Sequence, residues 1–194
     1  STQSRSSAAS DVYKRQGKST LMRSTQELIE RPWRDIPVSV TEDRLFGTID
    51  TEKAIYSGQK KLYPGIINEA DQGVLYLDDA NLLREDLLDS ILNIAEVGAY
   101  QLERDGLSLR CDTSFTVIAA INPESGMLSG ACLDQFGLFV NVDNIHDENT
   151  RVEILKRTIS FEKDCASFCN LWKLENEKIK KAIHLSLIHI SEPT

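Results

Sequence analysis

The residues that first indicate chemistry are Gly17-Lys18-Ser19-Thr20, which open an amphipathic segment. They match the second half of the phosphate-binding pattern GxxxxGK[ST]. In that pattern, backbone N–H groups at a helix N-terminus surround the phosphates, the lysine reaches the β- and γ-phosphate oxygens, and the hydroxyl is a ligand of Mg²⁺. The segment therefore predicts phosphate contacts from all four residues and a metal contact from Ser19, although so short a match also arises by chance.

A second candidate is the acid pair that ends the apolar run Leu75-Tyr76-Leu77-Asp78-Asp79. A buried strand followed by two acids has the form of a Walker B segment. In this reading Asp78 helps to hold Mg²⁺ through water, and Asp79 orients the attacking water. The alternative is an ordinary strand followed by the acidic first turn of a helix, which the helix dipole favours.

A third candidate is Asn122, which follows the apolar run from Phe115 to Ile121. If this run is a strand beside the one that ends at Asp78, the amide can point at the γ-phosphate or at the attacking water. An asparagine before a proline is also a common turn former. The order of the three segments favours a common site, because ligands of open α/β sheets bind beyond the carboxyl ends of the strands.

The elements that must position these residues follow from the apolar pattern. Short apolar runs alternate with helical segments, which predicts an α/β fold with a parallel sheet. We expect strands over residues 73–77, 115–121 and 138–142, and a hairpin centred on residues 105–106. We expect helices from residue 17 to Pro32, over 51–57 and 66–70, from a cap at Asn81 to Gly98, from Thr150, and over 162–183.

Composition limits the function classes. The chain has 194 residues, enough for one domain with a substantial core, and a net charge of −8. The acidic balance argues against a general nucleic-acid binder, and no apolar run reaches the roughly 20 residues of a membrane span. The four cysteines lack the spacing of a zinc or disulfide framework. These features predict a cytoplasmic protein.

A more specific pattern covers residues 40–83. This stretch resembles the magnesium chelatase I subunit, a family of AAA+ ATPases, and so do the hairpin segment ERDG (103–106) and the segment NPESG (122–126). The resemblance runs from Gly17 to about Asn170. The matching positions in the first stretch are Thr41-Glu42-Asp43-Arg44, Gly47, Asp50, Glu52-Lys53-Ala54, Pro64-Gly65 and Asn81-Leu82-Leu83.

The resemblance implies a P-loop NTPase core of the AAA+ type, with three layers. It implies ATP and Mg²⁺ as cofactors, a homo-oligomeric ring, expected to be a hexamer, and other chelatase subunits as partners that insert a metal into a tetrapyrrole. The alternatives are a degenerate AAA+ scaffold with weak ATPase activity and a MoxR-like remodelling ATPase. Neither a nucleic-acid partner nor a membrane span is implied.

Two departures from the family pattern concern the catalytic residues. Asp79 stands where the family usually has glutamate, so its carboxylate is one methylene shorter. Gln135, in the segment from Leu133 to Gly137, stands where the family has the arginine that reaches the neighbouring subunit's γ-phosphate. The resemblance therefore assigns catalysis to Asp79 and Asn122 and marks Gln135 as a substituted arginine-finger position.

Both ends of the chain have an unusual sequence property. The segments DVYKRQ (11–16) and LSLIHI (185–190) can be encoded by one short DNA string read in opposite orientations, and that string resembles a transposon end used in sequencing libraries. We therefore expect residues 1–16 and 185–194 to be translated adaptor rather than natural tails. Residues 17–150 would then be the ATPase core, without its first strand and half of its phosphate loop. Residues 151–184 would be a helical segment that leads to a missing lid, and we expect this fragment to be inactive by itself.

We expect the full-length protein to bind ATP but hydrolyse it slowly, because an arginine finger contributes about 10³–10⁵ to the rate in related NTPases. The variant Gln135→Arg should therefore raise the steady-state ATPase rate of the full-length protein. Equal rates for the two proteins would contradict this expectation.

Overall fold

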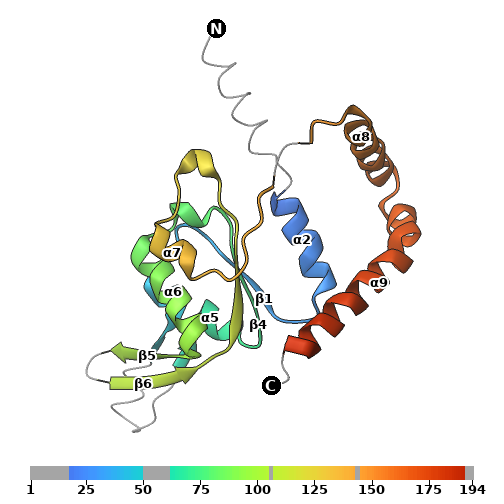
Figure 1. The fold of residues 1–194 in the computed structure, drawn as a ribbon. Helices are drawn as coiled ribbons and strands as arrows, with labels where there is room; N and C mark the ends of the chain where they lie inside the picture. Colours follow the sequence, from blue (N-terminus) through green and yellow to red (C-terminus); the bar gives the residue numbers. More distant parts are fainter. Residues whose placement is uncertain (1–17, 50–61, 105–106, 143–144, 191–194) are drawn as a thin grey trace. The chain divides into compact units, whose positions relative to one another are not determined.

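The computed structural model describes residues 18–49, 62–104, 107–142 and 145–190. The chain forms two compact units (Figure 1). Residues 31–139 form the sheet-containing unit, and residues 1–30 together with 140–194 form the helical unit.

A three-stranded parallel sheet is the centre of the sheet-containing unit. The strands β1 (Trp33–Ile36), β4 (Gly73–Leu77) and β7 (Phe115–Ala119) lie in the order β1-β4-β7. All five residues of the middle strand β4 are buried, which confirms the prediction from its continuous apolar run. The second predicted strand is confirmed as β7, although it ends two residues earlier than the apolar run.

The sequence gives a weaker signal for β1, and it was not predicted. Only its two end residues, Trp33 and Ile36, are buried, while Arg34 and Asp35 between them are exposed. Only four residues long and followed by Pro37, it lacks the continuous apolar pattern of a central strand. Its place at the end of the strand order fits this half-polar pattern.

Helix α6 (Glu85–Val97) covers one face of this sheet together with the short helix α5 (Ile66–Glu69). Both helices were predicted, and α6 ends as expected at Gly98, which adopts the left-handed conformation with φ of 75°. The predicted start is wrong, because Arg84 and not Asn81 precedes the helix. The apolar stripe of α6 packs on Leu75 and Leu77 of β4 and on Phe115 of β7, within one buried cluster.

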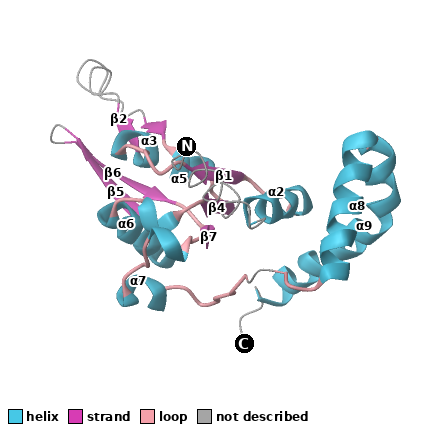
Figure 2. Cartoon of the chain, turned by 90° about the horizontal axis from the view of Figure 1, so that it is seen from above, coloured by secondary structure: helices cyan, strands magenta, loops and turns pink. Residues whose placement is uncertain are grey.

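Two antiparallel pairs complete the sheet-containing unit. The predicted hairpin is confirmed as β5 (Ala99–Arg104) paired with β6 (Leu107–Asp112), and it extends away from the parallel sheet (Figure 2). Its two turn residues lie outside the described residues. A smaller pair, β2 (Gly47–Ile49) with β3 (Leu62–Pro64), follows helix α3 (Glu42–Phe46). The helix predicted over residues 51–57 also lies outside the described part of the chain.

The hairpin is fastened to the rest of its unit by Tyr100. The Tyr100 hydroxyl lies 2.6 Å from the carbonyl oxygen of Phe46 and 2.7 Å from Oδ1 of Asn68. Gly47, next to this contact, has φ of 90°, and a Cβ added there would come within 2.3 Å of the Tyr63 carbonyl oxygen. A glycine is therefore required where β2 meets β3.

The strand predicted over residues 138–142 is wrong. This segment is an extended loop that pairs with none of the strands in the described residues, and the side chains of Leu138 and Val140 are 91% and 80% exposed. An apolar run becomes a strand only where a neighbouring backbone satisfies its N–H and C=O groups. The described residues place no such neighbour beside it.

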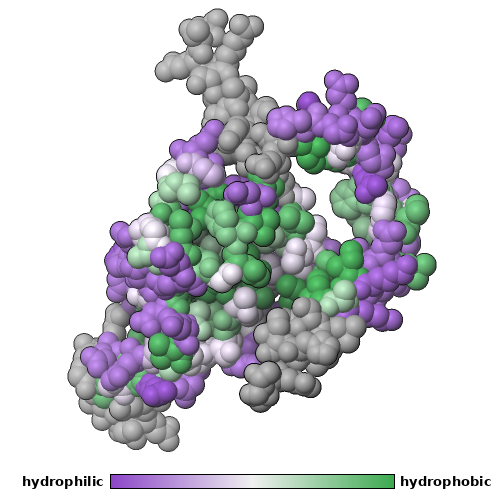
Figure 3. Space-filling view, in the orientation of Figure 1, coloured by the Kyte–Doolittle hydropathy of each residue, from purple (hydrophilic) through white to green (hydrophobic). Residues whose placement is uncertain are grey.

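The helical unit contains α2 (Lys18–Leu28), α8 (Glu148–Lys163) and α9 (Cys165–Ile190). All three helices were predicted, with boundaries that differ by one to seven residues. However, α2 buries none of its residues, and Leu21 is 54% exposed, so its predicted buried face is not observed. Hydrophobic side chains also lie among the hydrophilic ones on α8 and α9 (Figure 3), including Leu171 and Leu174, which are 78% and 77% exposed.

The break between α8 and α9 has a local cause. Asp164 leaves the helical conformation, with φ of −153° and ψ of 88°. Its side chain accepts a hydrogen bond of 3.0 Å from the backbone N–H of Ser167, and so caps the start of α9. Across the break, the rings of Phe161 and Phe168 lie edge to face at 5.8 Å. The boundary that was predicted between these two helices is therefore a junction at which Asp164 caps the start of α9.

None of the helices in the described part of the chain combines the length and apolarity that a membrane crossing needs.

The buried cluster leads to a prediction about how substitutions change the stability of the sheet-containing unit. Ile91 is fully buried beneath the sheet, whereas Val97 on the same helix is 66% exposed. Ile91→Ala should therefore lower the free energy of unfolding by about 2–5 kcal/mol, because it leaves a cavity. Val97→Ala should change it by less than about 0.5 kcal/mol in the same urea titration. Equal effects of the two substitutions would contradict the described packing.

Candidate functional site

The predicted acid pair and the predicted amide lie at one edge of the parallel sheet. Strands β4 and β7 are neighbours, and their register pairs Leu77 with Ala119, the last residue of each strand. Asp78 and Asp79 follow the first strand directly, and Asn122 follows the second by three residues. The expectation that the two strands end side by side is therefore confirmed. We call this region the catalytic edge, comprising residues 78–81 and 120–122.

Backbone hydrogen bonds continue between the two chain segments beyond the ends of the strands. The N–H of Ala120 donates to the Leu77 carbonyl at 2.8 Å, and the N–H of Ala80 donates to the Ala120 carbonyl at 2.9 Å. The turn that contains Asp79 is thus bonded directly to the turn that leads to Asn122. Because these bonds continue directly from the paired strands, they set the spacing between the acid pair and the amide.

Beyond these backbone bonds, the two segments are joined by the side chain of Asn81. Asn81 donates from Nδ2 to the carbonyl oxygen of Asn122 at 3.3 Å, and its Oδ1 accepts from the N–H of Asn122 at 3.4 Å. Both asparagines are half-buried. Asn81 was predicted to cap the following helix. It lies instead inside the 3-10 turn η1 (Ala80–Leu82) and binds the main chain of the predicted catalytic amide.

Asp79 occupies a left-handed backbone conformation, with φ of 53° and ψ of 50°. Residues other than glycine rarely adopt it, although aspartate and asparagine tolerate it better than most. This conformation turns the chain sharply out of β4, and the side chain is left half-buried. A strained residue directly after a strand is typical of functional sites.

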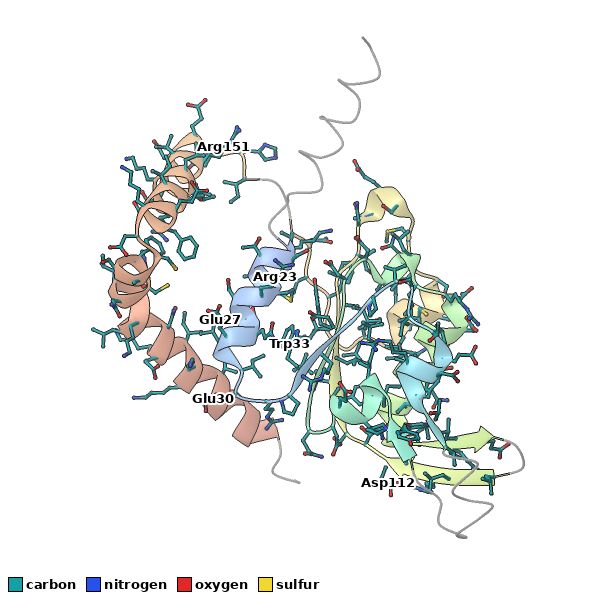
Figure 4. The ribbon with its side chains drawn as sticks, turned by 180° about the vertical axis from the view of Figure 1, so that it is seen from behind. Arg23, Glu27, Glu30, Trp33, Asp112 and Arg151 are labelled. Carbon is teal, nitrogen blue, oxygen red and sulfur yellow. The ribbon has the colours of Figure 1, made fainter. Side chains whose placement is uncertain are left out.

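Asp78 is exposed and is held by a neighbour on its own strand. The hydroxyl of Tyr76 donates to Oδ1 of Asp78 at 3.1 Å. Tyr76 is itself buried, and its ring lies 5.8 Å from that of Trp33 on the adjacent strand. Trp33 is labelled in Figure 4. The tyrosine therefore orients the carboxylate from a fixed position. Sequence reasoning missed this role, for which alternation along β4 was the available signal.

Asn122 caps the short 3-10 turn η2 (Pro123–Ser125). Its Oδ1 accepts from the N–H of Glu124 at 3.3 Å. The turn-forming reading of the Asn-Pro pair is thus confirmed, and it is compatible with a role at the catalytic edge. The cap uses the amide oxygen, and a phosphate oxygen can only accept, so a contact with a phosphate would come from the NH₂ group.

The remaining predicted site residues lie elsewhere in the structure. Lys18, Ser19 and Thr20 form the first turn of α2, in the helical unit, while Gly17 lies outside the described residues. Lys18 and Ser19 are half-buried and Thr20 is exposed. Their position at a helix N-terminus is the one that phosphate binding requires. Their approach to Asp78 remains a prediction.

Gln135 is the exposed C-terminal cap of helix α7 (Gly130–Asp134). This helix is anchored on α6 by Cys132, whose thiol lies 3.0 Å from Oδ1 of Asp89. Burial raises the pKa of the Cys132 thiol, and the bond to Asp89 raises it further, so the thiol stays protonated and donates. The Gln135 side chain is thus presented on the surface from a fixed helix, rather than at the catalytic edge.

The donor set of the catalytic edge fits Mg²⁺ bound together with a nucleotide. Mg²⁺ is usually held by one or two carboxylates, waters and substrate phosphates rather than by an all-protein cage. Asp78 provides an exposed carboxylate, and Asp79 a second one beside it. Among the described residues, no cluster of three or more His, Cys, Asp or Glu side chains could hold a metal. A hollow of about 340 Å³ in the same unit is bordered by Thr41 and Glu69 rather than by these acids.

Comparisons with known proteins agree with this geometry. The family described as "Magnesium chelatase, subunit ChlI" matches residues 6–135. The chain belongs to this family. The match begins within the segment predicted to be adaptor, so the boundary at residue 16 remains a prediction.

Individual relatives give the same result. The magnesium-chelatase 38 kDa subunit of Cereibacter sphaeroides is 38% identical over 162 residues, which cover 82% of this chain and 48% of the relative. That of Chlorobaculum tepidum is 40% identical over 157 residues, with 81% and 40% covered. The ChlI homolog of Methanocaldococcus jannaschii is 38% identical over 149 residues, with 77% and 41% covered. The chain spans less than half the length of these relatives.

A solved structure supports the fold class. It describes the complex between subunits BchI and BchD of magnesium chelatase from a cryo-EM reconstruction. The match has a TM-score of 0.55 at 39% identity and covers 78% of this chain and 47% of the other. The predicted α/β class, an AAA+ P-loop NTPase core with a parallel sheet, is confirmed.

The conformation of Asp79 leads to a prediction about stability. Asp79→Asn should change the free energy of unfolding by less than about 0.5 kcal/mol, because asparagine also tolerates the left-handed region. Asp79→Val should cost about 1–2 kcal/mol, since a β-branched residue does not. Urea unfolding of the two variants compares them directly. A valine variant as stable as the asparagine variant would show that the turn is not left-handed.

Proposed function

We propose that the full-length protein is the ATP-hydrolysing subunit of a metal chelatase. It would drive insertion of a metal into a tetrapyrrole together with partner subunits. The observation that carries the proposal is the catalytic edge, where an acid pair and an amide follow two adjacent parallel strands of a chain in the ChlI family. The assembly with other subunits is supported by the BchI–BchD complex that the fold matches.

Each residue has a distinct proposed role. The backbone at Gly17 and the first turn of α2 would bind the phosphates, with Lys18 on the β- and γ-phosphate oxygens and the hydroxyls of Ser19 and Thr20 beside them. Asp79 would accept a hydrogen bond from the attacking water and orient it. Asn122 would donate its NH₂ group to the γ-phosphate or to that water.

The metal of the substrate complex would be held by two residues, Ser19 through its hydroxyl and Asp78 through water. When bound, Mg²⁺ neutralises charge on the phosphates. Tyr76 contributes by fixing the Asp78 carboxylate, because its hydroxyl already bonds one of the two carboxylate oxygens. The orientation of the second Asp78 oxygen is then set by the buried ring of Tyr76 rather than by a mobile side chain.

We also propose that hydrolysis is slow and depends on a ring of subunits, because ATP would lie between neighbours. Gln135 is exposed at the end of α7, where it can face an adjacent subunit, but an uncharged amide stabilises developing phosphate charge less than a guanidinium does. This substitution favours the second candidate function, an AAA+ scaffold with weak ATPase activity. Neighbouring genes for other chelatase subunits would favour the first.

A variant of the phosphate-binding lysine tests the proposed ATP site. In the full-length protein, Lys18→Ala should weaken ATP binding about 10–150-fold, which corresponds to the loss of one charge-assisted hydrogen bond of about 1.5–3 kcal/mol. Lys156→Ala, which removes an exposed lysine from α8, is the matched control and should bind ATP like the unmodified protein. Calorimetric titration measures both. If the lysine variant binds ATP as tightly as the control, Lys18 is not a phosphate ligand and the nucleotide site lies elsewhere.

A further inference from the structure

We infer that Asn81 is a positioning residue for ATP hydrolysis, which acts by holding the main chain of Asn122 at the catalytic edge. This role rests on the proposed ATPase function. Asn81 contacts neither of the two predicted catalytic side chains through its own amide. Its side-chain amide bonds the N–H and the C=O of Asn122, at 3.4 and 3.3 Å.

The need for such a residue follows from the backbone path. Parallel pairing between β4 and β7 stops because the chain turns sharply at Asp79 and enters η1. The last backbone hydrogen bond between the two segments runs from the N–H of Ala80 to the carbonyl oxygen of Ala120. Beyond it the chain at Asn122 remains extended, with φ of −103° and ψ of 107°, and no longer has a strand beside it on this side.

The Asn81 side chain takes the place of the missing strand residue. A carboxamide has the same donor and acceptor pair as a peptide group, so it can bond both the N–H and the C=O of one residue. Aspartate would keep only the acceptor and would repel the carbonyl, and alanine would keep neither. Two half-buried backbone groups would then lose their partners, which is costly in a protein interior.

Loss of the Asn81 contacts would affect both predicted catalytic residues, Asp79 and Asn122. Asn81 is two residues from Asp79, and its amide holds Asn122, so the acid and the amide are joined through a short, bonded path. On its other side, Asn122 is fixed by the cap of η2. A shift of about 1 Å in a reacting geometry can lower a rate about a hundredfold. Removing Asn81 should therefore affect the chemical step more than ATP binding.

The test measures steady-state ATP hydrolysis by the full-length protein. Asn81→Ala should lower kcat about 10–100-fold while KM for ATP changes less than about threefold. Asn93→Ala, an exposed asparagine on α6, is the matched control and should retain the parental kcat. Asn81→Asp, which has almost the same shape, should also lower kcat. If the alanine variant does not fold, the kcat and KM of the aspartate variant test the proposal instead.

A double-mutant cycle separates positioning from a general structural role. If Asn81 acts through Asn122, the variant with both residues changed to alanine should be no slower than Asn122→Ala alone. A parental kcat in Asn81→Ala, or a double variant slowed by the product of the two single effects, would overturn the positioning role. If the unmodified protein and the Asn93 control fail to hydrolyse ATP, the proposed function itself is wrong, and the role of Asn81 with it.

Discussion

The parallel pairing of β4 with β7 is the constraint on which the candidate site depends. It places Leu77 opposite Ala119 and so brings two chain segments more than forty residues apart to one edge. Neither the acid pair nor the asparagine has a local reason to approach the other. They meet because two short apolar strands, the buried β4 and the partly buried β7, pair side by side, with α5 and α6 packed on one face. Changes to that buried cluster would therefore act on the site from a distance.

The edge itself is held together by hydrogen bonds that continue beyond the ends of the two strands. Backbone bonds join Leu77, Ala80 and Ala120, and a side-chain amide then bonds Asn122. The left-handed turn at Asp79 has an energetic cost, which the paired segments on either side offset. The proposed catalytic constellation would be rigid where geometry matters and exposed where a substrate must enter, since Asp78 lies on the surface.

Membership of the ChlI family and the two substitutions at the proposed site have different consequences. Family membership defines the fold, whereas a nucleotide-driven role beside other subunits belongs to the proposed function. In the proposed function, Asp79 and Gln135 instead concern how fast such a subunit would turn over. The shorter acid lies directly after β4, where it would orient the attacking water. The glutamine at the end of α7 lacks the charge that a neighbouring subunit's phosphate would use.

Much of this protein was determined by its sequence. The buried strand at residues 73–77, the stripe of α6, the hairpin turn and the order of the three site segments are all local patterns that burial and periodicity reveal. The half-polar strand β1 was not predictable in this way, because its pairing with β4 and not its composition makes it a strand. The segment at residues 138–142 failed for the converse reason, since its apolar residues have no neighbouring edge among the described strands. Asn81 shows the same limit at the site. One-dimensional spacing favours a helix cap, and only the adjacent turn, forty-one residues away along the chain, provides the partner that its amide binds.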